Sequence, residues 1–216
     1  MPYTITKTRK KQPPKESTTN EGLVTYKEYY EIIDEREKAD LLDGKIIRDS
    51  PAIPRHAHVV TRITTLIGNY AEKFNLGEVI GATTTVRLSA YQGPEPDILF
   101  ISRNRLGIMA DRYVDGPPDL CVEVISRSSR KRDRGRKFVL YADHGVREYW
   151  IIDPLYNTID CYENRGGEWI PIQPDDDGRL HSKVLPDFWL HPRWLGKTLM
   201  PPVSDILDEI LGGQRP

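Results

Sequence analysis

The spacing of apolar positions predicts two helices in the first third of the chain. Residues 55–75 carry apolar side chains three and four positions apart, which is typical of an amphipathic helix with one buried face. Gly77 supplies a stop signal for that helix. Earlier in the chain, Thr25 and Glu28 have the spacing of a capping box, so we expect a short helix from there to about residue 35.

Short apolar runs rich in β-branched residues predict strands. Asp43-Gly44 lies between two such runs and indicates a hairpin turn. The other predicted strands occupy residues 78–82, 84–89, 96–102, 119–126, 147–153, 158–163 and 168–173. A helix is expected over residues 128–143, between two apolar strands, and such a strand–helix–strand unit implies one parallel pair of strands.

These elements predict an α/β fold with a mixed central β-sheet flanked by helices. The length of 216 residues fits one domain with appendages. We expect a flexible basic arm over residues 1–20, which lack any apolar period, and a folded domain over residues 21–175. Residues 176–216 are rich in Trp and Pro and are expected to form a C-terminal extension that packs on the core, with a short helix near 203–211.

The composition favours a cytoplasmic protein without membrane segments. Hydrophobic residues make up 38% of the chain, but no apolar run approaches the ~18 residues of a membrane span. The amino terminus has no apolar stretch of the kind found in secretory signals. Two cysteines, Cys121 and Cys161, are too few for a disulfide framework or a thiolate metal site, and we expect both to be reduced.

Charge is balanced overall and segregated locally. The net charge of −1 gives no global basic bias toward nucleic acid. Residues 127–137 nevertheless carry seven basic side chains against one acid. Cations at the start of a helix oppose the helix dipole, which favours a functional role such as phosphate binding. The alternative is a solvated helix face on which Asp133 and Lys137 form an ordinary i,i+4 ion pair.

Two acids interrupt otherwise apolar strands. Asp97 begins the strand at 96–102, and Glu123 lies inside the strand at 119–126. A buried carboxylate must be paired, hydrogen-bonded or bound to a metal, and neither strand has a basic residue two positions away on the same face. Two carboxylates on neighbouring strands could hold Mg²⁺ through oxygen ligands. The alternative is that each acid lies at a strand end, half exposed, and bonds to a helix cap or an arginine.

Asp40 and Lys137 are further candidates. Asp40 alternates with Leu42 and could face inward, although such a residue taken alone is more often solvated. Lys137 shares a helix face with Tyr141, and from a helix over the sheet its ammonium could reach Glu123 and orient a water or stabilise a phosphoryl charge. The histidines have no recognised metal spacing, and no Gly-rich phosphate loop or nucleophile elbow is present.

Seven segments, taken in order, closely resemble those of the Uma2 family, which is placed with the PD-(D/E)XK restriction-endonuclease-like nucleases. They are D-L-L-D-G-K-I-I (40–47), P-R-H-A-H-V-V (54–60), V-R-L (86–88), P-D-I-L-F (96–100), P-D-L-C-V-E-V-I-S-R-S-S (118–129), D-R-G-R-K-F-V-L-Y (133–141) and G-V-R-E-Y-W-I-I-D-P (145–154). The resemblance covers about residues 22–175 without a break. No single segment is specific, but the seven in sequence are.

The resemblance implies a restriction-endonuclease-like core in which Mg²⁺ or Mn²⁺ supports the hydrolysis of DNA phosphodiester bonds. Position by position, Asp97 and Glu123 match the motif acids, which implies that both are catalytic and bind the metal. Asp40 falls where the family commonly has a glutamate and is implied as a third metal ligand. The lysine of an acid-x-Lys motif would fall at Ile125, so the resemblance implies that Lys137 on the next helix takes its catalytic role.

The implied partner is DNA, and basic side chains are expected to hold its backbone. Those side chains are Arg87, Arg130, Lys131, Arg132 and Arg134. A homodimer is expected because cuts in both strands need two sites, and Trp189 and Trp194 could supply an apolar contact. Two alternatives stay open: a nuclease-fold protein that binds nucleic acid or other partners without turnover, which Ile125 favours, and an accessory protein that is active only with partners.

Overall fold

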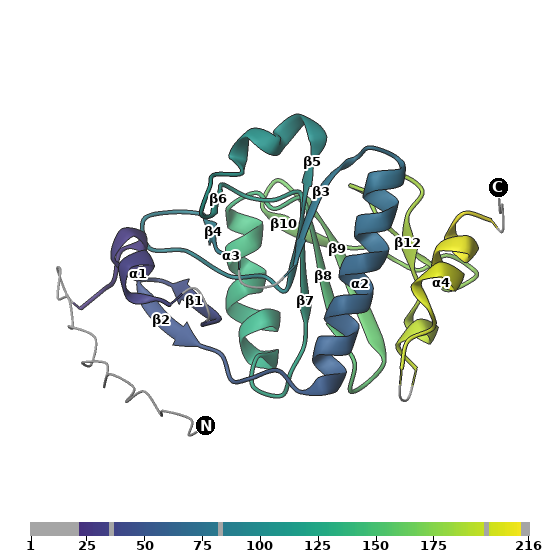
Figure 1. The fold of residues 1–216 in the computed structure, drawn as a ribbon, viewed down its shortest axis with the longest axis horizontal. Coiled ribbons are helices and arrows are strands. Elements are labelled where there is room, and N and C mark those ends of the chain that lie inside the picture. Colours follow the sequence, from purple (N-terminus) through teal and green to yellow (C-terminus); the bar gives the residue numbers. More distant parts are fainter. Residues whose placement is uncertain (1–21, 35–36, 82–83, 197–198, 213–216) are drawn as a thin grey trace, which may run out of the picture.

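A six-stranded mixed sheet forms the centre of the computed structural model, which describes residues 22–34, 37–81, 84–196 and 199–212 (Figure 1). The strands are β3 (Gly77–Gly81), β5 (Ile98–Ser102), β7 (Leu120–Val124), β8 (Glu148–Asp153), β9 (Thr158–Arg165) and β10 (Glu168–Pro171). Their order is β10-β9-β8-β7-β5-β3. Only β7 and β8 are parallel among these neighbours. The predicted α/β class and the predicted parallel crossover are confirmed, whereas the predicted arm at 1–20 lies outside the described residues.

Helices cover both faces of this sheet. α2 (Pro54–Lys73) packs on one face, where its buried side chains join those of alternate residues in β5, β7 and β8 in one hydrophobic cluster. α3 (Lys137–Asp143) packs on the other face, where Tyr141 joins Cys121, Tyr149 and Ile151. Successive residues of a strand point to opposite faces, so every side chain of β7 is assigned to one of these two layers.

The sequence explains where α2 begins and ends. Pro54 occupies the first turn, where its missing N–H costs no hydrogen bond. The left-handed backbone of Asn75, with φ of 56°, ends the helix. Gly77 follows with φ of 153°, and a Cβ there would lie 2.0 Å from the carbonyl oxygen of Ile101. Only glycine therefore lets the chain leave α2 and enter β3 directly beside β5.

Smaller elements complete the fold. They are α1 (Tyr26–Ile32), β1 (Ala39–Leu42), β2 (Lys45–Arg48), β4 (Val86–Arg87), β6 (Val114–Asp115), β11 (Leu180–His181), β12 (Trp189–Leu190), α4 (Val203–Ile210), and the 3₁₀ turns η1 (Arg103–Ile108) and η3 (Pro192–Leu195). The Thr25 hydroxyl accepts the Glu28 amide while the Glu28 carboxylate accepts the Thr25 amide, which confirms the capping box. The hairpin at Asp43-Gly44 is confirmed as β1 and β2.

Two sequence-predicted elements differ from the structure. The strand expected at 84–89 is only the two residues of β4, which pairs with β6 outside the main sheet. The helix expected over 128–143 contains a π-helical turn, η2 (Arg132–Arg136), before α3 begins. Gly135 lies inside this wider turn. Because glycine has no side chain, its backbone adopts such irregular geometry more easily than that of other residues.

The C-terminal extension packs against the α2 face of the sheet. Buried side chains of β12, η3 and α4 belong to the same hydrophobic cluster as α2, and Figure 1 shows α4 beside the α2 layer. Trp189 and Trp194 lie in this cluster with ring centroids 4.8 Å apart. They are 5% and 3% exposed, so the predicted apolar dimer contact through these two residues is wrong. No described helix is long and apolar enough to cross a membrane.

A buried carboxylate fastens the extension to the sheet. One oxygen of Glu148, at the start of β8, accepts the Trp150 indole N–H at 2.6 Å. The other accepts the Ser182 hydroxyl and the Lys183 and Val184 amides at 2.8–2.9 Å. Four donors therefore converge on an acceptor-only group, which compensates for the burial of its charge.

We expect Glu148→Gln to destabilise the fold by about 1–3 kcal/mol, because the new NH₂ group cannot accept the donors that face it. Urea denaturation of the full chain measures this change. Glu168→Gln, at an exposed position of β10, is the control and should leave the unfolding free energy within about 0.5 kcal/mol. Equal stability of the two variants would contradict the anchoring role of Glu148.

Candidate active site

Asp97 and Glu123 lie side by side on the α3 face of the sheet. β5 and β7 are antiparallel with Ile98 opposite Val122, so the next pair in the same register is Asp97 and Glu123. Alternation directs Ile98 and Val122 to the α2 layer and turns both acids to the other face. The Val124 amide donates to Asp97 Oδ2 at 2.8 Å and fixes the carboxylate beside β7.

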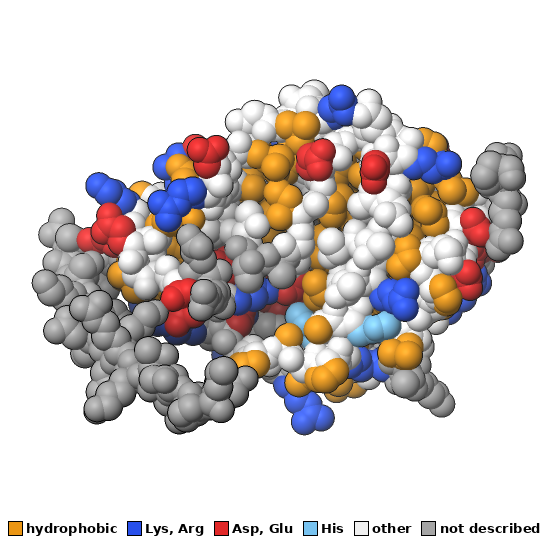
Figure 2. Space-filling view, in the orientation of Figure 1, with side chains coloured by type: hydrophobic (Ala, Val, Ile, Leu, Met, Phe, Trp, Pro, Cys, Tyr) orange, Lys and Arg blue, Asp and Glu red, His pale blue; other side chains and the backbone are white. Residues whose placement is uncertain are grey.

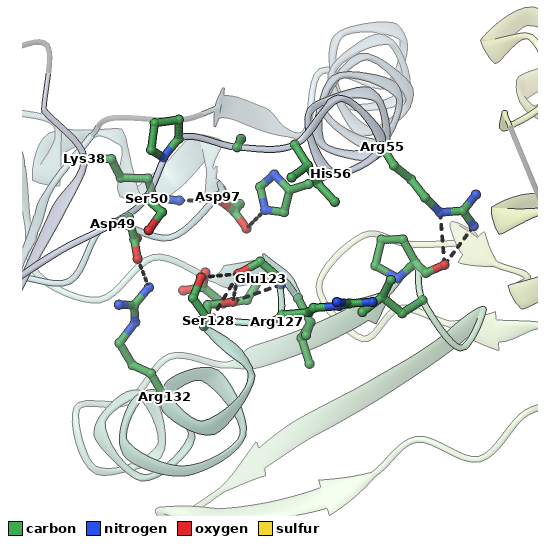
Figure 3. Close-up of a pocket in the computed structure, with 18 of the residues that line it drawn as sticks. Lys38, Asp49, Ser50, Arg55, His56, Asp97, Glu123, Arg127, Ser128 and Arg132 are labelled. Carbon is green, nitrogen blue, oxygen red and sulfur yellow. Dashed lines mark hydrogen bonds and ion pairs between the residues drawn. The ribbon is translucent and has the colours of Figure 1, made fainter.

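Asp97 is held between two basic side chains. Lys38, just before β1, forms an ion pair with Oδ1, and His56, in the first turn of α2, lies with Nε2 3.3 Å from Oδ2 (Figure 3). Burial alone would raise the pKa of this carboxyl. The His56 hydrogen bond and the Lys38 charge outweigh burial and hold the pKa of Asp97 below its ordinary value. Asp97 is therefore an anion at neutral pH.

Glu123 takes its partners from α3. Its Oε1 accepts the Lys137 ammonium at 2.8 Å and the Tyr141 hydroxyl at 2.9 Å, and these two donors lie one helical turn apart. Burial raises the pKa of Glu123 to about 8, and the Lys137 charge only partly offsets that rise. Its second oxygen, Oε2, has no hydrogen-bond partner within the part of the chain that the structure describes.

Lys137 is fully buried and has three oxygen partners, through two hydrogen bonds and an ion pair with Asp40. Besides Glu123, its Nζ lies 3.0 Å from Asp40 Oδ1 and 3.3 Å from the Glu95 carbonyl oxygen, so three acceptors match its three protons. Burial lowers the pKa of Lys137, but the Asp40 and Glu123 carboxylates outweigh it and raise the pKa above its ordinary value. The ammonium stays cationic. Its ion pairs are with Asp40 and Glu123 and not with Asp133, the i,i+4 partner considered from the sequence.

Asp40 does not join the other two acids at a common point. It is fully buried, and its Oδ1 accepts the Glu95 amide at 2.8 Å and forms an ion pair with Lys137. Oδ2 lies 3.0 Å from Arg132 Nε. The family resemblance implied three carboxylates around one cation. The structure brings Asp97 and Glu123 together, whereas Asp40 pairs with Lys137 and Arg132.

A cavity of about 860 Å³ opens over the two acids. The loop between β2 and α2 forms one wall and the turn after β7 forms another, with Lys38, His56, Asp97 and Glu123 among the lining residues. Figure 2 shows acidic and basic side chains close together in a hollow left of the centre of the molecule. Lys137 does not line the cavity, so the amine that can meet a bound molecule is that of Lys38.

The basic side chains predicted to contact DNA do not all lie at the cavity. Arg132 lines the cavity while pairing with Asp49 at 2.5 Å. Arg130 pairs with Asp153, Arg134 pairs with Asp160, and Lys131 is exposed. Arg87 lies elsewhere, at a second cavity of about 670 Å³, with its guanidinium paired to Asp115.

Arg127 is one of three basic residues at the cavity that the sequence did not identify as site residues. It is exposed, it lines the cavity in the turn after β7, and no described carboxylate pairs with it. Lys38 and His56 were also missed, because they reach Asp97 from segments 59 and 41 positions away in the sequence. The only hint in the sequence was that a basic residue stands directly before the hairpin and another stands in the first turn of the long helix.

The donor set fits a hard divalent cation with two protein carboxylates. No group of three or more His, Cys, Asp or Glu side chains among the described residues is arranged to hold a metal ion. Mg²⁺ commonly uses only one or two carboxylates and completes its shell with water and substrate oxygens. The anionic Asp97 and the free Oε2 of Glu123 meet that requirement at the cavity.

We expect Lys137→Met to destabilise the protein by about 3–5 kcal/mol, because it leaves Asp40 and Glu123 buried without their shared cation. Urea denaturation at pH 7 measures the loss. Lys131→Met, which removes an exposed ammonium from the same basic run, should change the unfolding free energy by about 0.5 kcal/mol or less. A Lys137→Met variant as stable as the wild type would contradict this charge arrangement.

Comparison with known proteins gives three results. The family model described as "Uma2: Putative restriction endonuclease" matches residues 26–193. The "Uncharacterized protein slr1290" of Synechocystis is 28% identical over 155 residues, which covers 70% of this chain and 80% of that protein. The crystal structure of "a putative nuclease belonging to DUF820" from Anabaena variabilis superposes with a TM-score of 0.67 at 16% identity, over 80% of this chain and 97% of the other. The last result concerns the fold alone.

Proposed function

This chain belongs to the Uma2 family, and on that premise we propose that it is a Mg²⁺- or Mn²⁺-dependent endonuclease that hydrolyses phosphodiester bonds of DNA. The observation that carries the proposal is the pairing of Asp97 and Glu123 on adjacent strands at the base of a cavity. Each carboxylate has its own lysine, and only one of those lysines lines the cavity.

Asp97 and Glu123 would hold the cation, with Asp97 contributing a full negative charge. When bound, the metal neutralises charge on the scissile phosphate and lowers the pKa of a coordinated water. His56 and the Val124 amide keep the Asp97 carboxylate in one orientation. Tyr141 and Lys137 do the same for Glu123 through Oε1, which leaves Oε2 for the metal.

The two lysines take different roles in this proposal. Sequence reasoning assigned the catalytic amine to Lys137, but its two hydrogen bonds, its ion pair with Asp40 and its complete burial support a positioning role. Lys38 lines the cavity and contacts Asp97, so its ammonium is the one we assign to the attacking water or to the phosphate charge. Asp40 then acts by holding Lys137 and Arg132, and not as a metal ligand.

Arg127 and Arg132 are the cavity cations that we assign to the DNA backbone, with Arg130, Lys131 and Arg134 on the neighbouring turns. Ile125 supports a second candidate function. It lines the cavity where a motif lysine would project, and an apolar side chain there favours binding of nucleic acid without turnover. A homodimer stays a prediction for an enzyme that cuts both strands.

Asp97→Asn and Glu123→Gln should each lower the rate of plasmid cleavage by roughly 10²-fold or more, because each replaces a carboxyl ligand of the cation with an amide. Nicking of supercoiled plasmid in Mg²⁺ or Mn²⁺ measures the rate, and EDTA should abolish it. Asp205→Asn, on the exposed face of α4, should cleave as the wild type does. A wild type that binds the metal and DNA but never nicks the plasmid would favour the second candidate function.

Lys38→Met should lower the cleavage rate by roughly 10²–10⁴-fold with a smaller loss of folding stability than Lys137→Met. The reason is that Asp97 keeps the Val124 amide and His56 as partners. Lys38→Arg, which retains the charge, should recover part of the rate. Full activity of Lys38→Met would contradict the catalytic role of Lys38 and favour Lys137 as the catalytic amine.

A further inference from the structure

The turn between β8 and β9 presents two apolar side chains to solvent in a fixed position. Leu155 is 43% exposed and Tyr156 is 71% exposed. One oxygen of the Asp153 carboxylate accepts the amides of both residues, at 3.0 Å and 3.3 Å. Exposed large apolar side chains cost solvation free energy, and this turn nevertheless holds them in place.

A cation supports the Tyr156 ring. The second oxygen of Asp153 lies 2.5 Å from the Arg130 guanidinium, and the Arg130 guanidinium lies 4.9 Å from the centroid of Tyr156. Asp153 is almost fully buried, so one carboxylate fixes both the backbone beneath the ring and the cation against it. The exposed ring is thereby pre-organised without being covered.

Arg55 joins this turn to the start of α2. Its guanidinium donates to the Pro154 carbonyl oxygen at 2.7 Å and to Asn157 Oδ1 at 3.0 Å. Ile53, the residue before α2, is 56% exposed. We call Ile53, Leu155 and Tyr156 the apolar rim.

Two of the three side chains of the apolar rim line the cavity that contains the two acids, and Tyr156 directly follows one of them in the chain. Ile53 and Leu155 both line that cavity, together with Arg127. Figure 3 shows Arg55 and Arg127 on the side of the cavity away from Lys38, with Asp97 and Glu123 between them. Figure 2 shows hydrophobic side chains along the lower edge of the hollow, below and to the right of its charged side chains.

We propose that the apolar rim binds an unpaired base of the DNA strand whose phosphate lies at Asp97 and Glu123, so the substrate class is single-stranded or locally unpaired DNA. This inference rests on the proposed function. An intact duplex offers a phosphate surface and hides the faces of its bases, whereas a single strand offers both phosphates and π faces. A cavity of about 860 Å³ also has the size of a pocket that encloses a ligand, which a phosphate contact alone does not require.

Charge favours nucleic acid over a protein segment as the occupant of the rim. Arg127 and Lys131 are exposed in the segment after β7 that also carries Arg130, and the Arg130 guanidinium lies against the Tyr156 ring. An aromatic side chain beside cations is the combination that binds successive bases and phosphates of a single strand. A purely apolar peptide would gain nothing from these charges.

The test is fluorescence anisotropy of the full chain in EDTA, which prevents hydrolysis, with a labelled 20-nucleotide single strand and its duplex. The wild type should bind the single strand at least roughly tenfold more tightly. Tyr156→Ala should weaken single-strand binding roughly 5- to 150-fold, the equivalent of one lost base stack, and leave duplex binding unchanged. Tyr156→Phe, which keeps the ring, should bind as the wild type does.

Val139→Ala is the matched control, since it removes an exposed apolar side chain of α3 that belongs neither to the apolar rim nor to the cavity lining. Its affinities should equal those of the wild type. Unchanged single-strand binding by Tyr156→Ala, or an equal loss for single strand and duplex, would overturn the inference. Plasmid nicking assays of the same proteins separate the two proposals. Single-strand binding that depends on Tyr156, without any cleavage, would contradict the nuclease function and support base binding by the apolar rim. Cleavage together with single-strand binding that does not depend on Tyr156 would support the nuclease function and contradict base binding by the rim.

Discussion

The arrangement of this protein depends on the neutralisation of buried carboxylates by buried or half-buried cations. Asp40, Asp97 and Glu123 are each at most 4% exposed, and an unpaired charge at such positions would cost several kcal/mol. Lys137 serves Asp40 and Glu123 from α3, while Lys38 serves Asp97 from the segment before β1. The hairpin, the sheet and α3 are therefore joined electrostatically through Lys137 and Lys38, and Asp97 and Glu123 lie at the cavity.

This constraint also separates structural charges from those available for chemistry. The ammonium of Lys137 contacts three protein oxygens, and both oxygens of Asp40 contact protein donors or cations. Asp97, Glu123 and Lys38 reach the cavity wall, where water or a phosphate can meet them. Under the proposed function, Lys38 supplies the amine from another segment, and an apolar Ile125 at the motif position is then compatible with turnover.

Periodic features were predictable from the sequence, and contacts between distant segments were not. The apolar spacing of α2, the hairpin at Asp43-Gly44 and the parallel pair β7–β8 follow from local rules. The presence of acids in apolar strands identified Asp97 and Glu123 as residues that need compensation. Lys38 and His56 could not be assigned to Asp97, because no spacing rule connects the start of a hairpin or a helix to a distant strand. The inward face of Asp40 followed from alternation, but its partners Lys137 and Arg132 did not, because alternation gives only the face of a side chain.

In the proposed enzyme, Asp97 and Glu123 together bind the catalytic cation. Anomalous diffraction at the manganese edge, from crystals of the full chain soaked in Mn²⁺, tests it most directly. We predict one manganese peak bonded at about 2.1 Å to an oxygen of each carboxylate, with Lys38 displaced from Asp97. A protein that nicks DNA in solution with Mn²⁺ while its soaked crystals show manganese only elsewhere, and Lys38 still on Asp97, would contradict the account.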